Sequence, residues 1–242
     1  MNNNIDVYSS SVAFTEDDVR DKTVVVIDVL RACSTIQAAL ENGAAGVIPV
    51  AENDDAGKYT RSLDASRILL CGEKGGKKIE GYRLGNSPLE YVYDIVNAKI
   101  IILKTTNGTR AVTRSSNAKE VLIASFLNLT AVVDYLKKQN TRDVLLICSG
   151  WNNRLSIEDM LCAGTLTYRL FDGKLPADAT DGTKVAFSLY QKFGENISKL
   201  IDSSNHAKRL KAIGYEKDID FCSQVDLYSS VPVLYQGMIR LN

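Results

Sequence analysis

Short apolar runs rich in β-branched residues alternate with amphipathic stretches along most of this chain, and this alternation is what most constrains its fold. The runs typical of β-strands are 5–8, 23–28, 46–50, 67–71, 99–104, 120–124 and 143–148. The stretches with helical periodicity are 34–42, 54–63, 88–96, 109–115, 128–138, 156–171 and 184–201. Strands that alternate with helices usually pair in parallel, so we predict a layered α/β fold with a largely parallel sheet.

The whole chain, residues 1–242, is expected to form one domain, because it contains no internal repeat and no low-complexity linker. The segment from about residue 205 is less regular than the rest. We expect it either to add a strand or to cover an edge of the sheet.

Charge and composition exclude several kinds of partner. Lys plus Arg and Asp plus Glu are equal at 29 each, so there is no electrostatic footprint for nucleic acid and no polybasic membrane patch. No apolar run approaches the roughly 18 residues of a membrane-spanning helix, and the N-terminal residues lack the features of a signal peptide. A small anionic substrate is the expected partner, and homo-oligomerisation is left open.

Cysteine and histidine usage narrows the chemistry further. The five cysteines are an odd number without a C-x-x-C pair, which disfavours disulfides and a zinc ribbon and fits a reducing cytoplasm. The single histidine, His206, lies in a polar run, and we expect it on the solvated surface. A Ser-His-Asp hydrolase or a multi-histidine zinc site is therefore disfavoured.

Charged and polar residues follow four of the predicted strands. In an open α/β sheet, ligands bind beyond the carboxyl ends of the strands. The four junctions read VVVIDVLRACST, ILLCGEKGGKK, IIILKTTNGTRAV and VLLICSGWNNRLSIEDM. Capping boxes are predicted for Ser34 with Gln37, for Ser156 with Asp159 and for Ser87 with Glu90. They would start a helix just after each polar junction.

The acids and bases at these junctions suit a divalent cation and an anionic ligand. The candidate metal-binding acids are Asp28, Glu73, Glu158 and Asp159. With oxygen ligands and no usable histidine, Mg²⁺ is the natural metal. The bases that could hold phosphate or sulfonate oxygens are Arg31, Lys74, Lys104, Arg110 and Arg154.

These motifs, in this order, resemble the 2-phosphosulfolactate phosphatase family. The resemblance is carried by DVLRACST, GEKGG, GYRLGNSPLEY, TTNGTRA, SIEDMLCAG and the late DFC…VDLYSSVPVL, and it extends from about residue 23 to 237. It implies a three-layer α/β/α fold particular to that family. It also implies a Mg²⁺-dependent phosphatase of coenzyme M biosynthesis that converts phosphosulfolactate to sulfolactate and phosphate.

The resemblance also implies site residues at the matching positions. They are Asp28, Arg31, Glu73, Asn86, Ser87, Thr105, Thr106, Asn107, Gly108, Arg110, Glu158 and Asp159. Two positions depart from the family pattern: Lys74 stands where an Arg is expected, and Arg83 where an acid is expected. We assign Arg31, Lys74 and Arg110 to the transferring phosphoryl group and Arg83 or Arg154 to the sulfonate. The sequence does not separate metal ligand from general base among the four acids.

Four other functions compete with this one. Residues 148–154, CSGWNNR, fit the C-x5-R loop of cysteine-dependent phosphatases, with Cys148 as nucleophile and Arg154 as the phosphate ligand. A haloacid-dehalogenase mechanism would need a second acid two residues after Asp28, where Leu30 stands. A non-catalytic protein that binds phosphate or sulfonate remains the alternative outside the enzymes. A dinucleotide-binding module lacks its G-x-G-x-x-G motif.

Overall fold

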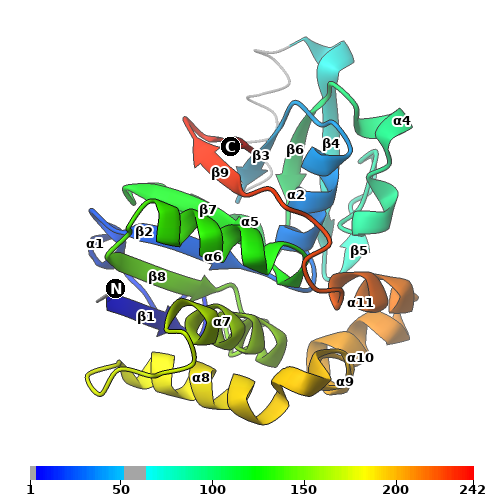
Figure 1. The fold of residues 1–242 in the computed structure, drawn as a ribbon. Coiled ribbons are helices and arrows are strands. Elements are labelled where there is room, and N and C mark those ends of the chain that lie inside the picture. The colour runs from blue at the N-terminus through cyan, green and yellow to red at the C-terminus, as the bar shows by residue number, and fades with distance from the viewer. Residues whose placement is uncertain (1–3, 52–63) are drawn as a thin grey trace.

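A large mixed sheet covered by helices on both faces forms the centre of the molecule (Figure 1). The structure is a computed structural model that describes residues 4–51 and 64–242. Its layers confirm the predicted three-layer α/β/α class. The predicted helix over 54–63 lies outside the described residues.

All seven predicted strands are present, with small shifts at their ends, and three more are added. The strands are β1 (Asn4–Tyr8), β2 (Thr23–Ile27), β3 (Gly46–Val50), β4 (Ile68–Lys74), β5 (Lys77–Lys78), β6 (Ile100–Lys104), β7 (Glu120–Ala124), β8 (Asp143–Cys148), β9 (Pro232–Tyr235) and β10 (Met238–Leu241). Their order across the sheet is β1-β8-β2-β7-β9-β10-β3-β6-β4-β5. The C-terminal segment therefore inserts a hairpin into the middle of the sheet instead of covering an edge.

That hairpin divides the sheet into two parallel sets. One set is β1-β8-β2-β7, the other is β3-β6-β4, and β9 and β10 join them by antiparallel pairing. Each joint rests on one residue pair, Leu122 with Val233 and Ile239 with Val47. In Figure 1 the two sets run in different directions, and the ends of β2 and β4 both approach the C-terminal helices. The polar junctions thus meet between two parallel sets, not along one edge of a single parallel sheet.

The helices confirm most of the predicted ones, and the C-terminal region adds two. They are α1 (Glu16–Val19), α2 (Ala32–Glu41), α4 (Tyr93–Val96), α5 (Gly108–Arg114), α6 (Leu129–Lys138), α7 (Ile157–Leu170), α8 (Asp181–Phe193), α9 (Ile197–Ser203), α10 (Asn205–Ala212) and α11 (Glu216–Cys222). The predicted helix 184–201 is divided by a 3-10 turn at Gly194–Asn196. Among the described helices, none combines the length and the apolar character needed to cross a bilayer.

Strand β2 shows how the core fixes the position of the first polar junction. All five of its residues are buried. Val25 and Ile27 pack into the apolar core on one face of the sheet, and Val24 and Val26 pack into the core on the other. Because alternate side chains of a strand point to opposite faces, this strand cannot slip by one residue without exchanging both sets of contacts. Asp28, directly after it, is held at a fixed place.

Candidate active site

Asp28 is the first polar residue beyond β2, and it lies at the floor of a cavity of about 180 Å³. It is buried, and its Oδ1 accepts a 3.1 Å hydrogen bond from the backbone N–H of Ala32, the first residue of α2. Gly108 packs directly against it, because a Cβ at that position would lie 2.5 Å from Asp28 Oδ2 and 2.4 Å from the Ala32 Cβ. The glycine of the TTNGT motif is therefore required by the close approach of α5 to this carboxylate.

The environment of Asp28 disfavours its charged form. Burial raises the pKa of Asp28 to about 6, and the nearby carboxylates Glu73 and Glu158 add to this, against the lowering effect of His206. A carboxylate with a raised pKa in a cavity is a candidate for cation binding or proton transfer.

Glu73 ties two of the strand-end loops together. Its Oε2 accepts a 2.6 Å hydrogen bond from the Gly76 N–H and its Oε1 a 2.6 Å bond from the Thr106 N–H. Gly75 and Gly76 join β4 to β5 with φ values of +61° and +86°, the positive pair that a two-residue hairpin turn favours. The predicted Gly-rich loop is therefore a tight turn, held beside the TTNGT loop by a buried carboxylate.

The TTNGT loop forms another side of the cavity. Thr105, Thr106 and Asn107 line it, after the end of β6. Thr105 and Thr109 exchange hydrogen bonds, each backbone N–H donating to the other's Oγ1 at 3.1 Å. This reciprocal pair fixes the turn into α5.

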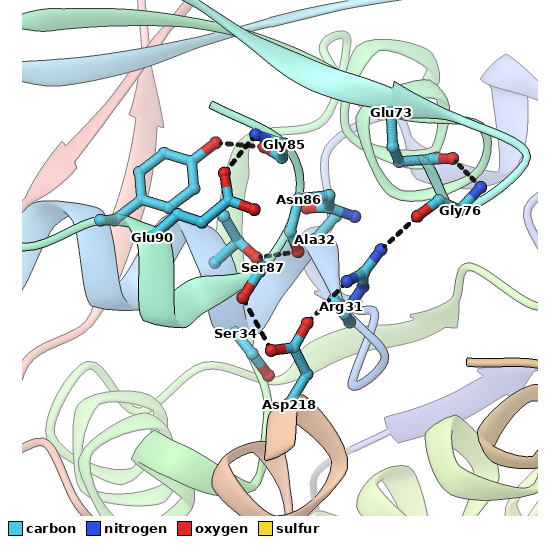
Figure 2. Close-up of polar contacts among 12 residues, drawn as sticks. Arg31, Ala32, Ser34, Glu73, Gly76, Gly85, Asn86, Ser87, Glu90 and Asp218 are labelled. Carbon is cyan, nitrogen blue, oxygen red and sulfur yellow. Dashed lines mark hydrogen bonds and ion pairs between the residues drawn. The ribbon is translucent and has the colours of Figure 1, made fainter. Parts of the chain in front are cut away.

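Arg31 is held inside the cavity by partners from distant parts of the chain. Its Nη1 donates to Asp218 Oδ2 at 2.6 Å and its Nη2 to the Gly76 carbonyl at 2.9 Å. Figure 2 shows the guanidinium between these two partners. The ring of Tyr215 lies 4.1 Å from the guanidinium carbon. Ser87 donates to the other oxygen of Asp218 at 2.7 Å, so the predicted ligand Ser87 reaches the site only through Asp218.

His206, expected on the solvated surface, is a residue of the cavity, and that prediction is wrong. Its side chain is only 15% exposed, and its Nδ1 lies 3.1 Å from Glu158 Oε1. Its ring stacks on Trp151 at 5.3 Å between centroids. The polar run around His206 folds as α10, whose inner face reaches over the strand ends. Sequence polarity alone could not reveal that contact.

Glu158 serves the site as the partner of His206. Although burial raises its pKa, the hydrogen bond and the charge of His206 outweigh this, so the pKa of Glu158 is lowered. Its second oxygen, Oε2, is buried without a hydrogen-bond partner. Glu158 and Arg154 line a neighbouring cavity of about 620 Å³, on the other side of Trp151 and His206.

Asp159 binds backbone N–H groups of the loops that follow β2 and β8. Its Oδ1 accepts from the Val29 N–H at 2.9 Å and its Oδ2 from the Gly150 N–H at 3.1 Å. Burial raises its pKa well above the ordinary value, and Asp28 and Glu158 raise it further. It therefore joins the loops after β2 and β8, and it does not line the cavity.

The structure does not gather the four predicted acids into a ready metal site. Within the described ranges 4–51 and 64–242, no three Asp, Glu, His or Cys side chains are grouped to hold a metal ion. Asp28 and Glu73 line the same cavity, but both Glu73 oxygens accept backbone N–H groups. Asn86 also lines this cavity, and its Oδ1 is buried without a partner.

Five of the predicted basic residues do not line the cavity. Lys74, Arg83, Arg110 and Arg154 are exposed, and Lys104 is the half-buried last residue of β6. Strand alternation explains the first, because Glu73 points inward and its neighbour Lys74 must point outward. Arg110 follows Gly108 and the buried Thr109 on the outer side of α5. The arginine that the sequence did not suggest, Arg209 of α10, lines the cavity and donates to the Gly75 carbonyl at 3.2 Å.

The structure contradicts the cysteine-dependent mechanism. Cys148 is the fully buried last residue of β8, and its Sγ contacts Met160 Sδ at 3.7 Å. Burial raises the pKa of its thiol well above the ordinary value, whereas a nucleophilic cysteine needs a lowered one. All five cysteines are buried free thiols, as the absence of disulfide spacing predicted.

The strand ends of this α/β/α sheet thus surround a small cavity that has carboxylates, guanidinium groups and a histidine on its walls. A family model described as 2-phosphosulpholactate phosphatase matches residues 9–237. The chain belongs to this family, whose members are phosphoric monoester hydrolases, so it is an enzyme and not a binding module.

Similar proteins carry the same name. A protein of Thermotoga petrophila, named probable 2-phosphosulfolactate phosphatase, is 44% identical over 223 residues, covering 92% of this chain and 93% of its own. A protein of Caldanaerobacter subterraneus with that name is 39% identical, covering 98% and 97%. One of Clostridium acetobutylicum, also so named, is 37% identical, covering 97% and 99%.

Proposed function

We propose that the chain catalyses the Mg²⁺-dependent hydrolysis of 2-phospho-3-sulfolactate to 3-sulfolactate and phosphate, a step of coenzyme M biosynthesis. The observation that carries the proposal is the composition of the cavity. Asp28, Glu73, Arg31 and Arg209 line one space of about 180 Å³, which suits a small, highly charged substrate. The names of the relatives supply the particular substrate.

The phosphate group is assigned to Arg31 and the TTNGT loop. Arg31 is buried in the wall of the cavity, where a guanidinium can donate two parallel hydrogen bonds to phosphate oxygens. Thr105, Thr106 and Asn107 add hydroxyl and amide groups to the lining of the same cavity. Such fixed donors stabilise the charge on the transferring phosphoryl group.

The oxygen groups of the cavity fit Mg²⁺ in kind. Asp28 supplies a buried carboxylate with a raised pKa, and Asn86 supplies a buried amide oxygen without a partner. Mg²⁺ keeps several waters and needs only one or two carboxylates, so the lack of a larger acid cluster does not count against it. We assign the ion to Asp28 and Asn86, with Glu73 beside them. When bound, it would neutralise phosphate charge and lower the pKa of bound water.

The sulfonate is assigned to Arg209. The sequence suggested Arg83 or Arg154, but neither lines this cavity. Arg31 is already neutralised by Asp218, whereas no ion pair of Arg209 is present among the described residues. Arg209 is therefore the guanidinium best placed to meet a second anion.

His206 is assigned to the leaving oxygen. Hydrolysis breaks the bond between phosphorus and the C2 oxygen of the substrate, and that oxygen must gain a proton. The Nδ1 of His206 is occupied by Glu158, and stacking on Trp151 fixes the plane of the ring. This leaves Nε2 to donate the proton, in the manner of a general acid oriented by a carboxylate.

Phosphate release from synthetic phosphosulfolactate tests the function directly. The purified chain with Mg²⁺ should release phosphate and 3-sulfolactate in equal amounts. EDTA should abolish the reaction and added Mg²⁺ should restore it. Full activity after EDTA would overturn the metal requirement, and absence of phosphate release with Mg²⁺ would overturn the substrate.

A further inference from the structure

Asp218 is the buried carboxylate closest to the phosphate-binding arginine, and sequence motifs did not suggest it. It lies in the first turn of α11, far along the chain from the strand-end loops. Its two oxygens accept from Arg31 Nη1 at 2.6 Å and from Ser87 Oγ at 2.7 Å. The Arg31 and Asp218 side chains are only 2% and 3% exposed. Figure 2 shows Asp218 reaching up from its helix to both partners.

The contacts of Arg31 leave its guanidinium little freedom. Asp218 holds one amino group, the Gly76 carbonyl holds the other, and the Tyr215 ring lies 4.1 Å from the guanidinium carbon. These partners come from α11, from the β4–β5 turn and from the residue before α11. A planar donor group fixed at two nitrogens and one face holds its remaining N–H donors in fixed directions.

The ion pair is not explained by the docking of α11 alone. Ile219 and Cys222 on the same helix are already buried in the apolar core. A buried ion pair gives little net stability, because both charges lose their hydration. Apolar residues in place of both charges would hold the helix as well. The carboxylate is useful at this position because of the group it orients.

We propose that Asp218 is a positioning residue, which holds the Arg31 guanidinium in the orientation that receives phosphate oxygens. Ser87 fixes the second oxygen of Asp218 and so sets the direction from which the carboxylate meets Arg31. The proposal rests on the proposed function only for the identity of the substrate. Orientation of a binding group by a partner of this kind is worth about 10- to 100-fold in affinity or activity in comparable settings.

A double-mutant cycle tests whether Asp218 acts through Arg31. The proteins are wild type, Asp218→Asn, Arg31→Ala and the double variant. For each, we would measure kcat and KM for phosphosulfolactate, the dissociation constant of inorganic phosphate, and the melting temperature. Asp218→Asn should lower kcat/KM by about 10- to 100-fold in the presence of Arg31. It should have no further effect on kcat/KM or on phosphate affinity once Arg31 is Ala.

Melting temperatures distinguish a positioning role of Asp218 from a purely structural one. Arg31→Ala leaves a buried carboxylate without its partner, so the double variant should melt higher than Arg31→Ala while being no more active. If Arg31→Ala does not fold, Arg31→Lys replaces it in the cycle, since it keeps the charge and loses the planar fork. Ser87→Ala removes only one hydrogen bond from Asp218 and should give a smaller loss of the same kind.

Asp226→Asn is the matched control. It breaks another Asp–Arg pair, with Arg169 at 2.9 Å, away from the cavity. It should lower the melting temperature and leave kcat, KM and phosphate affinity unchanged. The inference is overturned if Asp218→Asn behaves like this control, or if its effects persist undiminished in the Arg31→Ala background. If wild type does not hydrolyse phosphosulfolactate, the proposed function fails, and the phosphate-binding cycle still tests the positioning role.

Discussion

Two regions line the cavity, and they differ in how well local sequence patterns predict them. In the first region, the strand-end loops, Asp28 and the TTNGT residues directly follow apolar strands, and Glu73 lies near the end of β4. The C-terminal helices α10 and α11 supply His206, Arg209 and Asp218, from segments that look like ordinary polar helices. The first region offers Arg31, oxygen atoms and backbone amides, and the second offers His206, Arg209 and the carboxylate partner of Arg31.

This difference suggests that the two regions have different functions within the site. The loops are fixed by the sheet, because both cores hold the strands in register. The helices lie over these loops and touch them at a few points, such as Arg209 on Gly75 and Asp218 on Arg31. We therefore expect the loops to govern phosphate and metal binding, and the helices to govern substrate choice and the fate of the leaving group. Variants in each region test this division.

Substrate choice should depend on α10. Wild type should prefer phosphosulfolactate over phospholactate, which lacks the sulfonate, by about 100-fold in kcat/KM, because phospholactate offers Arg209 no anion to bind. Arg209→Gln should remove most of this preference by weakening phosphosulfolactate alone. Arg83→Gln is the control and should leave both values unchanged, since Arg83 is exposed outside the cavity. Equal kcat/KM values for the two substrates on wild type would mean a general phosphatase.

A comparison of two substrates with different leaving groups tests the role of His206. His206→Gln should lower kcat for phosphosulfolactate by about 100-fold, within the range for loss of a general acid. It should hardly affect 4-nitrophenyl phosphate, whose leaving group departs without a proton. Glu158→Gln should show the same selectivity with a smaller loss, since Glu158 only orients the ring. An equal loss on both substrates would contradict proton donation by His206.

Metal binding should depend on the loops. Asp28→Asn should weaken Mg²⁺ binding by about 10- to 100-fold, the scale for disturbing a metal site. The raised pKa of Asp28, about 6, adds a pH dependence. Protons compete with the ion below that pH, so Mg²⁺ affinity should fall as pH drops through 6. Calorimetric titration at pH 5, 6 and 7 measures this, and the Asp28→Asn protein should lack the trend.

The sequence predicted the strands and the strand-end loops well because their signals are local. An apolar β-branched run followed by a polar residue is visible in a window of about ten residues. The capping boxes were less reliable. Ser34 lies inside α2 and donates to the Val29 carbonyl, and Asp159 accepts from Val29 and Gly150 instead of capping α7. At the site, side chains with capping potential are used for contacts between loops.

The remainder of the site depends on contacts that no local pattern encodes. Asp218 meets Arg31 across 187 positions in the sequence, and His206 meets Glu158 across 48. The central hairpin β9–β10 brings the chain back into the sheet after these helices, which fixes them over the strand ends. Predicted arginines were misplaced for a related reason. Charge alone does not say which side of a strand or helix a residue occupies.

The smallest effect on activity is expected for Cys148→Ser. This variant distinguishes chemistry at the strand-end loops from a mechanism with a thiolate nucleophile. Cys148→Ser should keep kcat within about twofold of wild type, because the thiol lies in the core and not in the cavity. The buried hydroxyl should instead cost about 1–3 kcal/mol in the free energy of unfolding if it finds no partner. Iodoacetamide should react slowly with the native enzyme, since burial raises the pKa of this thiol. A loss of several orders of magnitude in kcat, or a trapped phosphocysteine, would move the chemistry from the strand-end carboxylates to the CSGWNNR loop.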